Sequence, residues 1–548
     1  MSCSKIFPGD FPELTCEVIK YLQNDYSTLY SCVLVNRLWC LLAIPLLWEN
    51  PISISNPNGN YNFNFIEIYL HNLNDDKLNE YKINDNPLPL NTLFNYPKFL
   101  KYLNTYDIFD SVDGWVEGFI RTSKPENRYF LKGLNFHSVT DFKELIIMSL
   151  FKLFIENEVN LHTLEIKVTD PNFHTCFYNI LDRIIQIINL HQNLKTILLG
   201  NGNLLFYRPL LLSKDCNCSN SLNNIILCSV DFNNMNNFKK IFEQLNVLES
   251  VHVVHCSSLS DFIQQIITLT KPFKLKSLFI NEILQIESIQ LLLQKSGDYL
   301  ENFGYRFDLD YNLSLKKQQL LELITKYCKN IKFLDLYGID NLIIYPIINL
   351  IENVKQNLSY LSISTCNNNP LTWEDYFYSS YGDTECSSII LQNLGQTLPS
   401  KLEYLHLSLH HIKTSDFEIF LKNSQDTFIK KLLIYHRESQ DILPTVKEYI
   451  MKKERVKYLA IGEPFFDAST IIYCNELILW EDEVKEFEFS NLKIPYHSEI
   501  KQPFFELNSG QRSHNSGQNR HNAGQGCLFS GLFNFGMFVN EIIITFIK

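Results

Sequence analysis

The residues that could hold a metal ion through thiolates are few in this chain of 548 residues. Cys216 and Cys218 form a Cys-x-Cys pair, and Cys228 follows ten residues later. A single Cys-x-Cys pair in a polar segment is a weak signal for zinc, so we interpret these thiols as structural or incidental. His514 and His521 recur in a polar repeat without a carboxylate or thiolate partner, which indicates solvated side chains.

Sequence motifs of catalysis are absent as well. The chain has no P-loop, dinucleotide fingerprint, HExxH or GxSxG motif in a strand-to-helix context. It also lacks the two interleaved sets of Cys and His that a RING-type ligase needs. The unpatterned region 52–97 has neither the length nor a motif for a hidden enzyme. The sequence therefore predicts a binding protein without catalytic residues, cofactor or metal.

Net charge and cysteine usage indicate which class of partner and which cellular compartment to expect. The net charge of −12 argues against a general nucleic-acid surface, which needs a basic face to displace counterions from phosphate. The 14 cysteines are scattered, and no secretory signal is recognisable at the amino end. Reduced thiols in the cytoplasm or nucleus are therefore expected rather than a disulfide framework.

The segment from Phe7 to Pro51 is too apolar and too short to form a domain alone. From Ser27 to Trp48, 16 of 22 residues are Ala, Val, Ile, Leu, Trp, Tyr or Cys. No single helix face can bury them all, so the segment must pack against something else.

Local signals in this segment predict a set of short helices. Pro12 and the one-turn spacing of the following apolar residues indicate a first helix that Asn24-Asp25 ends. Ser27 is expected to cap a second helix, which Asn36-Arg37 interrupts, and a third apolar stretch ends near Pro45.

The order of residues in this segment resembles an F-box. The resemblance rests on Pro-Glu-Leu at 12–14, Tyr-Leu at 21–22, Ser-Cys-Val-Leu-Val-Asn-Arg-Leu-Trp at 31–39 and Ile-Pro-Leu-Leu-Trp at 44–48, although Phe11 stands where the family usually has Leu. F-boxes dock on a Skp-type adaptor, which links them to a cullin ubiquitin ligase. By position, the resemblance implies adaptor-facing or core roles for Pro12, Leu14, Val18, Leu22, Leu29, Val33, Val35 and Trp39. The alternative is a helical cap over the following domain.

A repeated pattern of the form apolar-x-x-apolar-x-apolar occupies most of the remaining chain. Its usual step is near 27 residues, within the range of leucine-rich repeats. The second apolar residues of the copies are Leu134, Leu164, Ile197, Ile226, Val251, Leu278, Phe303, Leu334, Leu361, Leu405, Leu432, Leu459 and Leu477, with a possible first copy at Leu103.

Segments between these copies have the apolar spacing of helices. They are 177–190, 237–245, 261–269, 286–293, 315–327 and 343–354. Each unit is thus strand, turn and helix, and it must stack on its neighbours to bury its inner face. The resemblance to an F-box and to leucine-rich repeats implies an α/β fold, with a short all-α F-box followed by a leucine-rich-repeat solenoid. Such a solenoid is a horseshoe with parallel strands on the concave face and helices on the convex face.

Two stretches depart from the repeat. The step between Leu361 and Leu405 encloses Asn367–Glu385, which is acidic, aromatic and free of Lys and Arg, and we expect a surface loop there. After Trp480 the pattern stops, and from residue 508 a polar seven-residue repeat predicts disorder. The apolar end, Leu528–Ile547, contains three polar residues that disfavour a transmembrane anchor.

The expected domains are therefore an F-box at 1–51, a joint at 52–99 with a short helix at 65–73, and repeats at 100–482. A possible cap at 483–507 and a polar, then apolar tail at 508–548 complete the chain.

Side chains alternate across a strand, so two positions of each repeat should point away from the core. They are the residue between the second and third apolar positions and the residue after the third, and they form two exposed stripes. Aromatic residues dominate interface energies, which favours Tyr337, Tyr435 and Trp480 of the second stripe as client-binding residues. Trp373, Tyr376 and Phe377 of the acidic loop are further candidates, and a disordered insertion is the alternative for that loop.

These observations predict a non-catalytic substrate-recognition adaptor of a Skp-cullin-F-box ubiquitin ligase. Its partners are a Skp-type adaptor, through it a cullin, and a protein client, with no nucleic acid and no membrane. The alternative is a scaffold of the same fold that assembles through its F-box without ubiquitin transfer.

Overall fold

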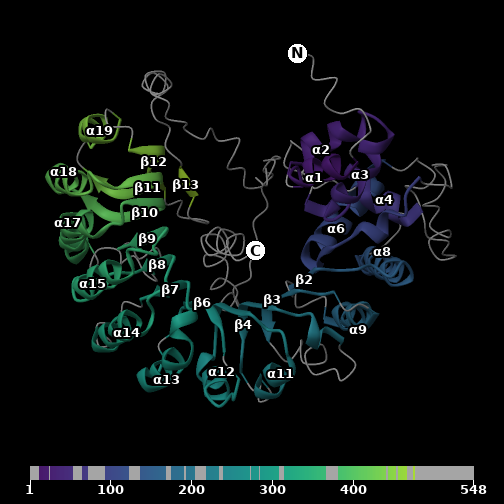
Figure 1. Ribbon diagram of the computed structural model, residues 1–548, viewed down its shortest axis with the longest axis horizontal. Helices are drawn as coiled ribbons and strands as arrows, with labels where there is room; N and C mark the ends of the chain where they lie inside the picture. The colour runs from purple at the N-terminus through teal and green to yellow at the C-terminus, as the bar shows by residue number, and fades with distance from the viewer. Residues whose placement is uncertain are drawn as a thin grey trace, which may run out of the picture. The chain divides into compact units, whose positions relative to one another are not determined.

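The chain forms two compact units in a computed structural model (Figure 1). One unit comprises Met1–Val251 with Thr268–Lys271, and the other comprises His252–Ile267 with Pro272–Lys548. The structure describes residues 12–23, 25–53, 64–71, 93–122, 136–167, 174–190, 193–203, 217–233, 238–271, 273–282, 284–307, 314–365, 380–439, 442–451, 455–465 and 473–475.

The first unit begins with helices and continues as alternating strands and helices. Its α-helices are α1 (Pro12–Lys20), α2 (Tyr26–Val33), α3 (Arg37–Leu47), α4 (Asn64–His71), α6 (Thr105–Thr122), α8 (Phe136–Glu156), α9 (His174–Leu190) and α11 (Phe238–Gln244), with short 3-10 turns η2 (Pro51–Ser53), η4 (Tyr96–Phe99) and η7 (Asn217–Asn220). Its strands are β1 (Tyr102–Asn104), β2 (Thr163–Lys167), β3 (Thr196–Asn203) and β4 (Asn224–Asp231). Strand β5 (Ser250–Cys256) crosses the boundary between the units.

The second unit repeats the same alternation. Its strands are β6 (Leu275–Ile280), β7 (Asn302–Arg306), β8 (Phe333–Tyr337), β9 (Tyr360–Ser364), β10 (Lys401–Ile412), β11 (Phe428–Ser439), β12 (Val456–Phe465) and β13 (Tyr473–Asn475). Its helices are α12 (Leu259–Ile266), α13 (Ile286–Ser296), α14 (Ser314–Tyr327), α15 (Ile344–Val354), α17 (Ser380–Thr397), α18 (Thr414–Asn423) and α19 (Leu443–Val446), with the short turns η8 (Gly297–Tyr299) and η10 (Lys447–Met451).

In each unit the strands follow one another in the sheet as they do in the sequence. The pairs from β1 to β4 and from β6 to β12 are parallel, and only β13 runs antiparallel to its neighbour β12 among the described pairs. The apolar repeat positions pair directly, as in Leu103 with Leu164 and Leu334 with Leu361. The predicted mixed α/β architecture with a parallel sheet is confirmed.

One backbone arrangement recurs between consecutive strands. The carbonyl oxygen of Lys101 accepts hydrogen bonds from the N–H groups of His162 at 2.8 Å and Thr163 at 3.1 Å. A carbonyl oxygen has two lone pairs, so one loop residue satisfies two donors of the next repeat. The same double acceptance occurs at Glu49, His162, Lys195, Asn223, Glu301, Lys332 and Ser359.

The helical segment α1–α3 is joined to the first strand through Glu49. Its carbonyl oxygen accepts from the N–H groups of Lys101 and Tyr102 at 3.0 and 3.1 Å. Its buried carboxylate accepts from the Lys101 ammonium and, at 2.7 Å, from the Gln23 amide. The Trp48 ring lies 4.3 Å from the Tyr96 ring between centroids. The segment is therefore fixed to the first repeat by hydrogen bonds, an ion pair and ring packing.

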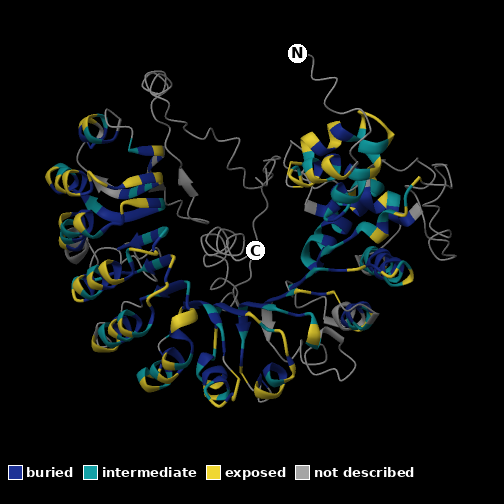
Figure 2. Ribbon diagram, in the orientation of Figure 1, coloured by how far each residue is buried: buried dark blue, intermediate teal, exposed yellow. Residues whose placement is uncertain are grey.

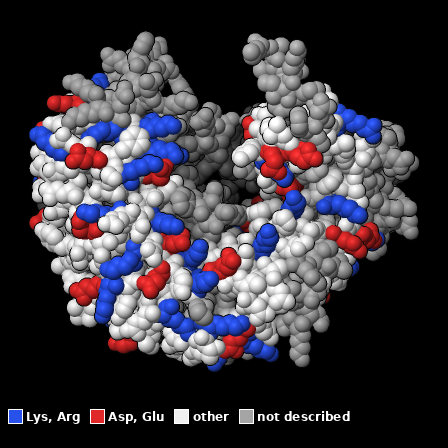
Figure 3. Space-filling model, in the orientation of Figure 1, with Lys and Arg blue, Asp and Glu red and all other residues white. Residues whose placement is uncertain are grey.

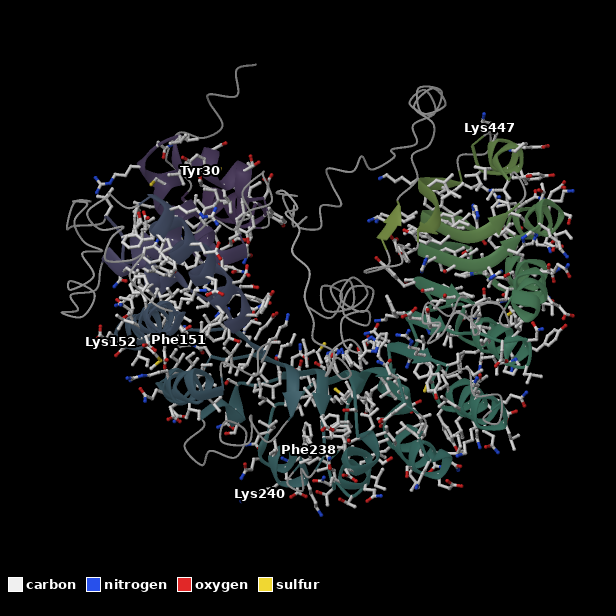
Figure 4. All side chains as sticks on the ribbon, turned by 180° about the vertical axis from the view of Figure 1, so that it is seen from behind. Tyr30, Phe151, Lys152, Phe238, Lys240 and Lys447 are labelled. Carbon is white, nitrogen blue, oxygen red and sulfur yellow. The ribbon has the colours of Figure 1, made fainter. Side chains whose placement is uncertain are left out.

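Helices bury one side and expose the other (Figure 2). Figure 4 shows Phe151 of α8 and Phe238 of α11 on the strand-facing sides of their helices, whereas Lys152 and Lys240 point outward. Both phenylalanines are buried, as the apolar spacing of these helices requires.

Two helix caps differ from the sequence expectation. Asp25, rather than Ser27, caps α2, because its carboxylate accepts from the N–H of Thr28 at 3.0 Å and the Thr28 hydroxyl at 2.6 Å. Asn36 caps α3 through the N–H of Trp39, and α3 continues through Pro45 to Leu47. A charged acceptor makes the stronger bond to orphan N–H groups, which favours Asp25 over the neighbouring hydroxyl.

Three expectations about the repeats need correction. Phe136, expected to end a strand centred on Leu134, begins helix α8, and β1 pairs directly with β2. In β4 the register is offset by one, since Ile225 rather than Ile226 pairs with Ile197. The expected loop at 367–385 ends earlier, because α17 begins at Ser380.

The region expected to be a joint contains ordered packing. The predicted short helix at 65–73 is α4, and Phe65, Ile66, Tyr69 and Leu70 are buried. The expected cap at 483–507 and tail at 508–548 lie outside the described residues.

Candidate interaction surfaces

Helices α1–α3 enclose a small core. Its buried residues are Ile19, Leu29, Cys32, Ala43 and Leu47, and half-buried side chains such as Trp39 and Val33 pack against it. A core of this size leaves several large apolar side chains between Pro12 and Leu47 exposed.

Six large apolar side chains on these helices and on the turns that follow α1 and α2 are exposed, and we call them the exposed apolar surface. Tyr21 is 88% exposed, Leu34 is 74% exposed and Tyr30, labelled in Figure 4, is 65% exposed. Leu14, Val35 and Leu41 are the other members. Exposed large apolar groups in this number on one short segment make the segment a candidate for contact with a protein.

The structure separates the eight predicted adaptor-binding residues by burial. Leu14 and Val35 belong to the exposed apolar surface, whereas Leu29 is fully buried and holds the core. Half-buried positions are occupied by Val18, Leu22, Val33 and Trp39, and Pro12 is the first residue of α1.

Four members of the exposed apolar surface were missed by the sequence analysis. Tyr30 lies on α2 and Leu34, one turn later, is the residue that caps its carboxyl end; they are next to Leu29 and Val33 in the sequence. Because residues four apart share a helix face, their common exposure follows once Leu29 is known to face the core. Tyr21 and Leu41 are the other two.

A second candidate surface lies on the sheet of the second unit, on the side opposite the helices. Here four aromatic rings follow one another across the strands, and we call them the aromatic ladder. Phe279 lies 5.8 Å from Phe333, Phe333 lies 5.4 Å from Tyr360, and Tyr360 lies 5.1 Å from Tyr404, between ring centroids. The last two pairs are stacked, with interplanar angles of 21° and 18°.

Gly304 makes the first step of the ladder feasible. Strand β7 lies between β6 and β8, so the Phe279 ring must cross it to reach Phe333. A Cβ atom at Gly304 would lie 2.2 Å from Cδ1 of Phe279, closer than any real contact. Glycine is therefore required here by close approach of a side chain.

Polar side chains occupy the next register position beside the ladder. Asp335, Ser362 and His406 stand opposite one another on β8, β9 and β10. The Asp335 carboxylate bonds to Ser362, and the Ser362 hydroxyl lies 3.1 Å from Nδ1 of His406. We call these three residues the polar row.

Burial sets the charge of the polar row. It raises the pKa of Asp335 to about 6, although the Ser362 hydrogen bond and the Arg306 charge oppose this rise. Burial also lowers the pKa of His406 to about 4. At neutral pH the row thus holds an ionised carboxylate and a neutral imidazole.

Two predicted client-binding residues lie beside the polar row. Tyr337 and Tyr435 are half-buried on β8 and β11. The guanidinium carbon of Arg306 lies 4.6 Å from the Tyr337 ring centroid, and the Tyr435 ring meets the His406 ring edge-on at 5.4 Å. The other predicted client-binding residues, Trp480, Trp373, Tyr376 and Phe377, lie outside the described residues.

The expectation of two exposed stripes is wrong for much of the first stripe. Glu165, Leu198, His252, Phe279 and His406 are all buried. Strands lie about 4.8 Å apart, so neighbouring side chains on one face cover one another. The second stripe is only partly exposed, since Ser364 and Ser408 are buried as well.

One further position of each repeat lies on the same face of the sheet as the two stripes. Phe333, Tyr360 and Tyr404 precede the second apolar residue, and alternation places them on the same face as the two stripes. The signal was available in the sequence, because these three positions are all aromatic.

Charges of both signs are interspersed on the molecule: Figure 3 shows Lys and Arg among Asp and Glu on one face. Among the ion pairs, Glu301 lies 3.6 Å from Lys276 and 3.0 Å from Lys332. Within the described ranges no helix has both the length and the apolar character to cross a bilayer. The same residues contain no group of three His, Cys, Asp or Glu side chains that could hold a metal ion.

No protein-family model matches this chain, and no curated protein sequence matches it.

Proposed function

We propose that this chain is a substrate-recognition adaptor: α1–α3 bind a Skp-type adaptor, and the sheet face of the second unit binds a protein client. Through the Skp-type adaptor the chain would bring its client to a cullin ubiquitin ligase. The contribution of such a subunit is effective concentration and orientation rather than chemistry.

The observation that carries this proposal is the exposed apolar surface. Its members come from all three helices, which share one small core and are fixed to the first repeat through Glu49. Apolar groups held in fixed positions on a rigid support are suited to burial against a permanent partner. The resemblance to an F-box supplies the identity proposed for that partner.

The described cysteines support the proposed cytoplasmic or nuclear location. The seven cysteines whose side chains the structure describes are free thiols, and five of them are buried: Cys32, Cys228, Cys256, Cys328 and Cys386. Buried thiols of this kind act as small apolar groups.

Copurification of the full chain with a coexpressed Skp-type adaptor tests the proposal. Leu14→Asp with Val35→Asp should reduce adaptor recovery at least tenfold, because both side chains are exposed and neither supports the core. The matched control is Leu315→Asp with Leu342→Asp, which alters two leucines of similar exposure in the second unit. Equal recovery from both double variants would contradict the proposal.

The scaffold alternative is distinguished in the same preparation. A complex that contains the Skp-type adaptor but recruits no cullin, and does not support ubiquitin transfer to a bound client, favours assembly without ubiquitination. Recruitment of a cullin favours the ligase subunit.

A further inference from the structure

The last parallel strand of the second unit has an edge that is only partly covered. Strand β12 pairs with β11 over residues 456–462. On the side away from β11, β13 lies beside β12 and pairs only with its end, at residues 463–465 (Figure 1). Among the described residues, no strand pairs with 458–462 on that side. Such an edge presents backbone N–H and C=O groups to which a further strand can add.

The direction of β13 follows from the length of its connection to β12. Only seven residues, 466–472, link the two strands. A parallel crossover needs a dozen or more residues, so a connection this short must return antiparallel. The structure has this reversal, since Glu463 pairs with Asn475 and Phe465 pairs with Tyr473. The direction differs from the parallel copy that the apolar pattern predicts around Leu477.

The register of β13 indicates which residues would come next along the open edge. Each step forward from Asn475 moves one step back along β12 from Glu463, so Leu477 falls opposite Ile461 and Leu479 falls opposite Leu459. Residues directly opposite each other in an antiparallel pair share one face of the sheet. Leu459 and Ile461 are both buried. The two leucines therefore fall where they extend the existing core.

The same register brings an aromatic residue to the other face. Tyr360, Tyr404, Lys431 and Tyr458 stand at one position on four consecutive strands. Trp480 falls opposite Tyr458, so it joins the row that contains two members of the aromatic ladder. Aromatic and β-branched residues favour strands, which suits the Leu-Ile-Leu-Trp stretch at 477–480 to pairing.

Charge also favours this segment as the occupant of the edge. Lys457 at the beginning of β12 and Lys431 on the neighbouring strand are exposed. The register places Glu481 opposite Lys457, and five of the eight residues 481–488 are acidic. Opposite charges that face each other across two strands stabilise their pairing.

We propose that residues 476–481 continue β13 as an antiparallel strand and cover the open edge of β12 within the same chain. The array of parallel strands then ends on a reversed strand, and this edge is closed to a strand of another protein. The inference goes beyond the proposed function and does not depend on it, because it concerns neither the Skp-type adaptor nor the identity of the client.

Paired cysteines in the full chain test the register. Tyr458→Cys with Trp480→Cys places two thiols opposite each other, at a separation that a disulfide spans. Mild oxidation should link them within one chain, as detected by mass spectrometry of the digested protein. The matched control is Tyr458→Cys with Glu476→Cys, which are opposite only in the parallel copy, and it should give at least tenfold less cross-link. Single variants measure the background from the native cysteines.

Hydrogen exchange gives a second readout that needs no cysteine variant. In the unmodified chain the amides of 476–481 should exchange at least tenfold more slowly than in an unstructured peptide. Leu477→Asp with Leu479→Asp puts two charges into the core and should remove this protection, together with part of that at 458–462. The control, Leu528→Asp with Leu532→Asp, changes two leucines outside the proposed strand and should leave both unchanged.

Four results would overturn the inference. They are equal yield from the two cysteine pairs, a higher yield from the parallel pair, cross-links found only between two chains, and unprotected amides at 476–481 in the unmodified chain. Adaptor recovery is measured on the same variants and should stay unchanged. Its loss in Leu14→Asp with Val35→Asp therefore reports on the proposed function alone, whereas the cross-link reports on the edge of β12 alone.

Discussion

The two candidate surfaces differ in how far their apolar side chains are exposed and in whether polar side chains lie beside them. The exposed apolar surface presents Tyr21, Tyr30 and Leu34 to solvent. The sheet face of the second unit buries Phe279 and Phe333, half-covers Tyr360 and Tyr404, and holds the polar row beside these rings. Apolar contact supplies affinity with little discrimination, whereas unpaired polar groups reject ligands that cannot satisfy them. The first surface thus fits the proposed Skp-type adaptor, a constant partner, and the second fits the proposed client, which must be selected.

The largest expected effect is on the core that supports the exposed apolar surface. Leu29→Ala removes a fully buried side chain from a core of five residues and should lower the free energy of unfolding by about 2–5 kcal/mol. Urea denaturation of the full chain measures it. Adaptor recovery should fall with it, and a change below 1 kcal/mol would show that the helices do not depend on this core.

The next effect concerns the aromatic ladder. Gly304→Ala forces the buried Phe279 ring to move and should cost about 1–3 kcal/mol. In a Phe279→Ala background the same substitution should cost less than about 0.5 kcal/mol, because the clash is gone. Additive effects in this double-mutant cycle would mean that the ring does not cross β7.

Acidification should act on the polar row and not on the exposed apolar surface. His406 has a folded pKa of about 4 against 6.5 when unfolded, so the unfolded state binds more protons and stability falls as pH drops through this window. Between pH 7 and pH 5 its contribution is a loss of about 2 kcal/mol.

Protonation of Asp335 should raise stability on acidification, whereas protonation of His406 should lower it, so Asp335 serves as the control. Its folded pKa of about 6 exceeds the ordinary 3.8, so the folded state binds more protons and gains about 1 kcal/mol over the same pH interval. His406→Asn should therefore reduce acid destabilisation, and Asp335→Asn should increase it. Denaturant midpoints at pH 7 and pH 5 measure both, and the reverse order would refute the assignment.

The smallest expected effect on stability belongs to a substitution on the exposed apolar surface. Leu34→Asp changes an exposed residue and should alter the free energy of unfolding by no more than about 0.5 kcal/mol. Adaptor recovery should nevertheless fall. Loss of stability of several kcal/mol would place Leu34 in a packed environment and remove it from the exposed apolar surface.

Much of the fold could be predicted because the spacing of apolar residues along the sequence matches the periods of its helices and strands. The predicted helices at 315–327 and 343–354 correspond to α14 and α15, and the strand residues Leu334 and Leu361 pair as expected. The offset of β4 could not be predicted, since Ile225, Ile226 and Leu227 are all apolar and equally able to face the core.

The candidate site was less predictable because it depends on neighbours distant in sequence. Tyr337 and Tyr435 were identified from their position in the repeat and their aromatic type, but the polar row needs three strands in register over 71 positions, from Asp335 to His406. Burial of the first stripe likewise arises from adjacent strands and has no signature in any single repeat. Phe333, Tyr360 and Tyr404 were accessible to alternation and were overlooked.

The double acceptance at Glu49 has a consequence for association between molecules. A parallel sheet leaves its first strand with open hydrogen-bonding groups, which can pair with another chain. Glu49 takes the N–H groups of Lys101 and Tyr102 and so ends the ladder on a helical segment instead of on a bare edge. The segment that presents the proposed adaptor-binding surface thereby also covers the start of this edge strand. Adaptor recruitment and protection of this edge against pairing with another chain would then depend on the same helical segment.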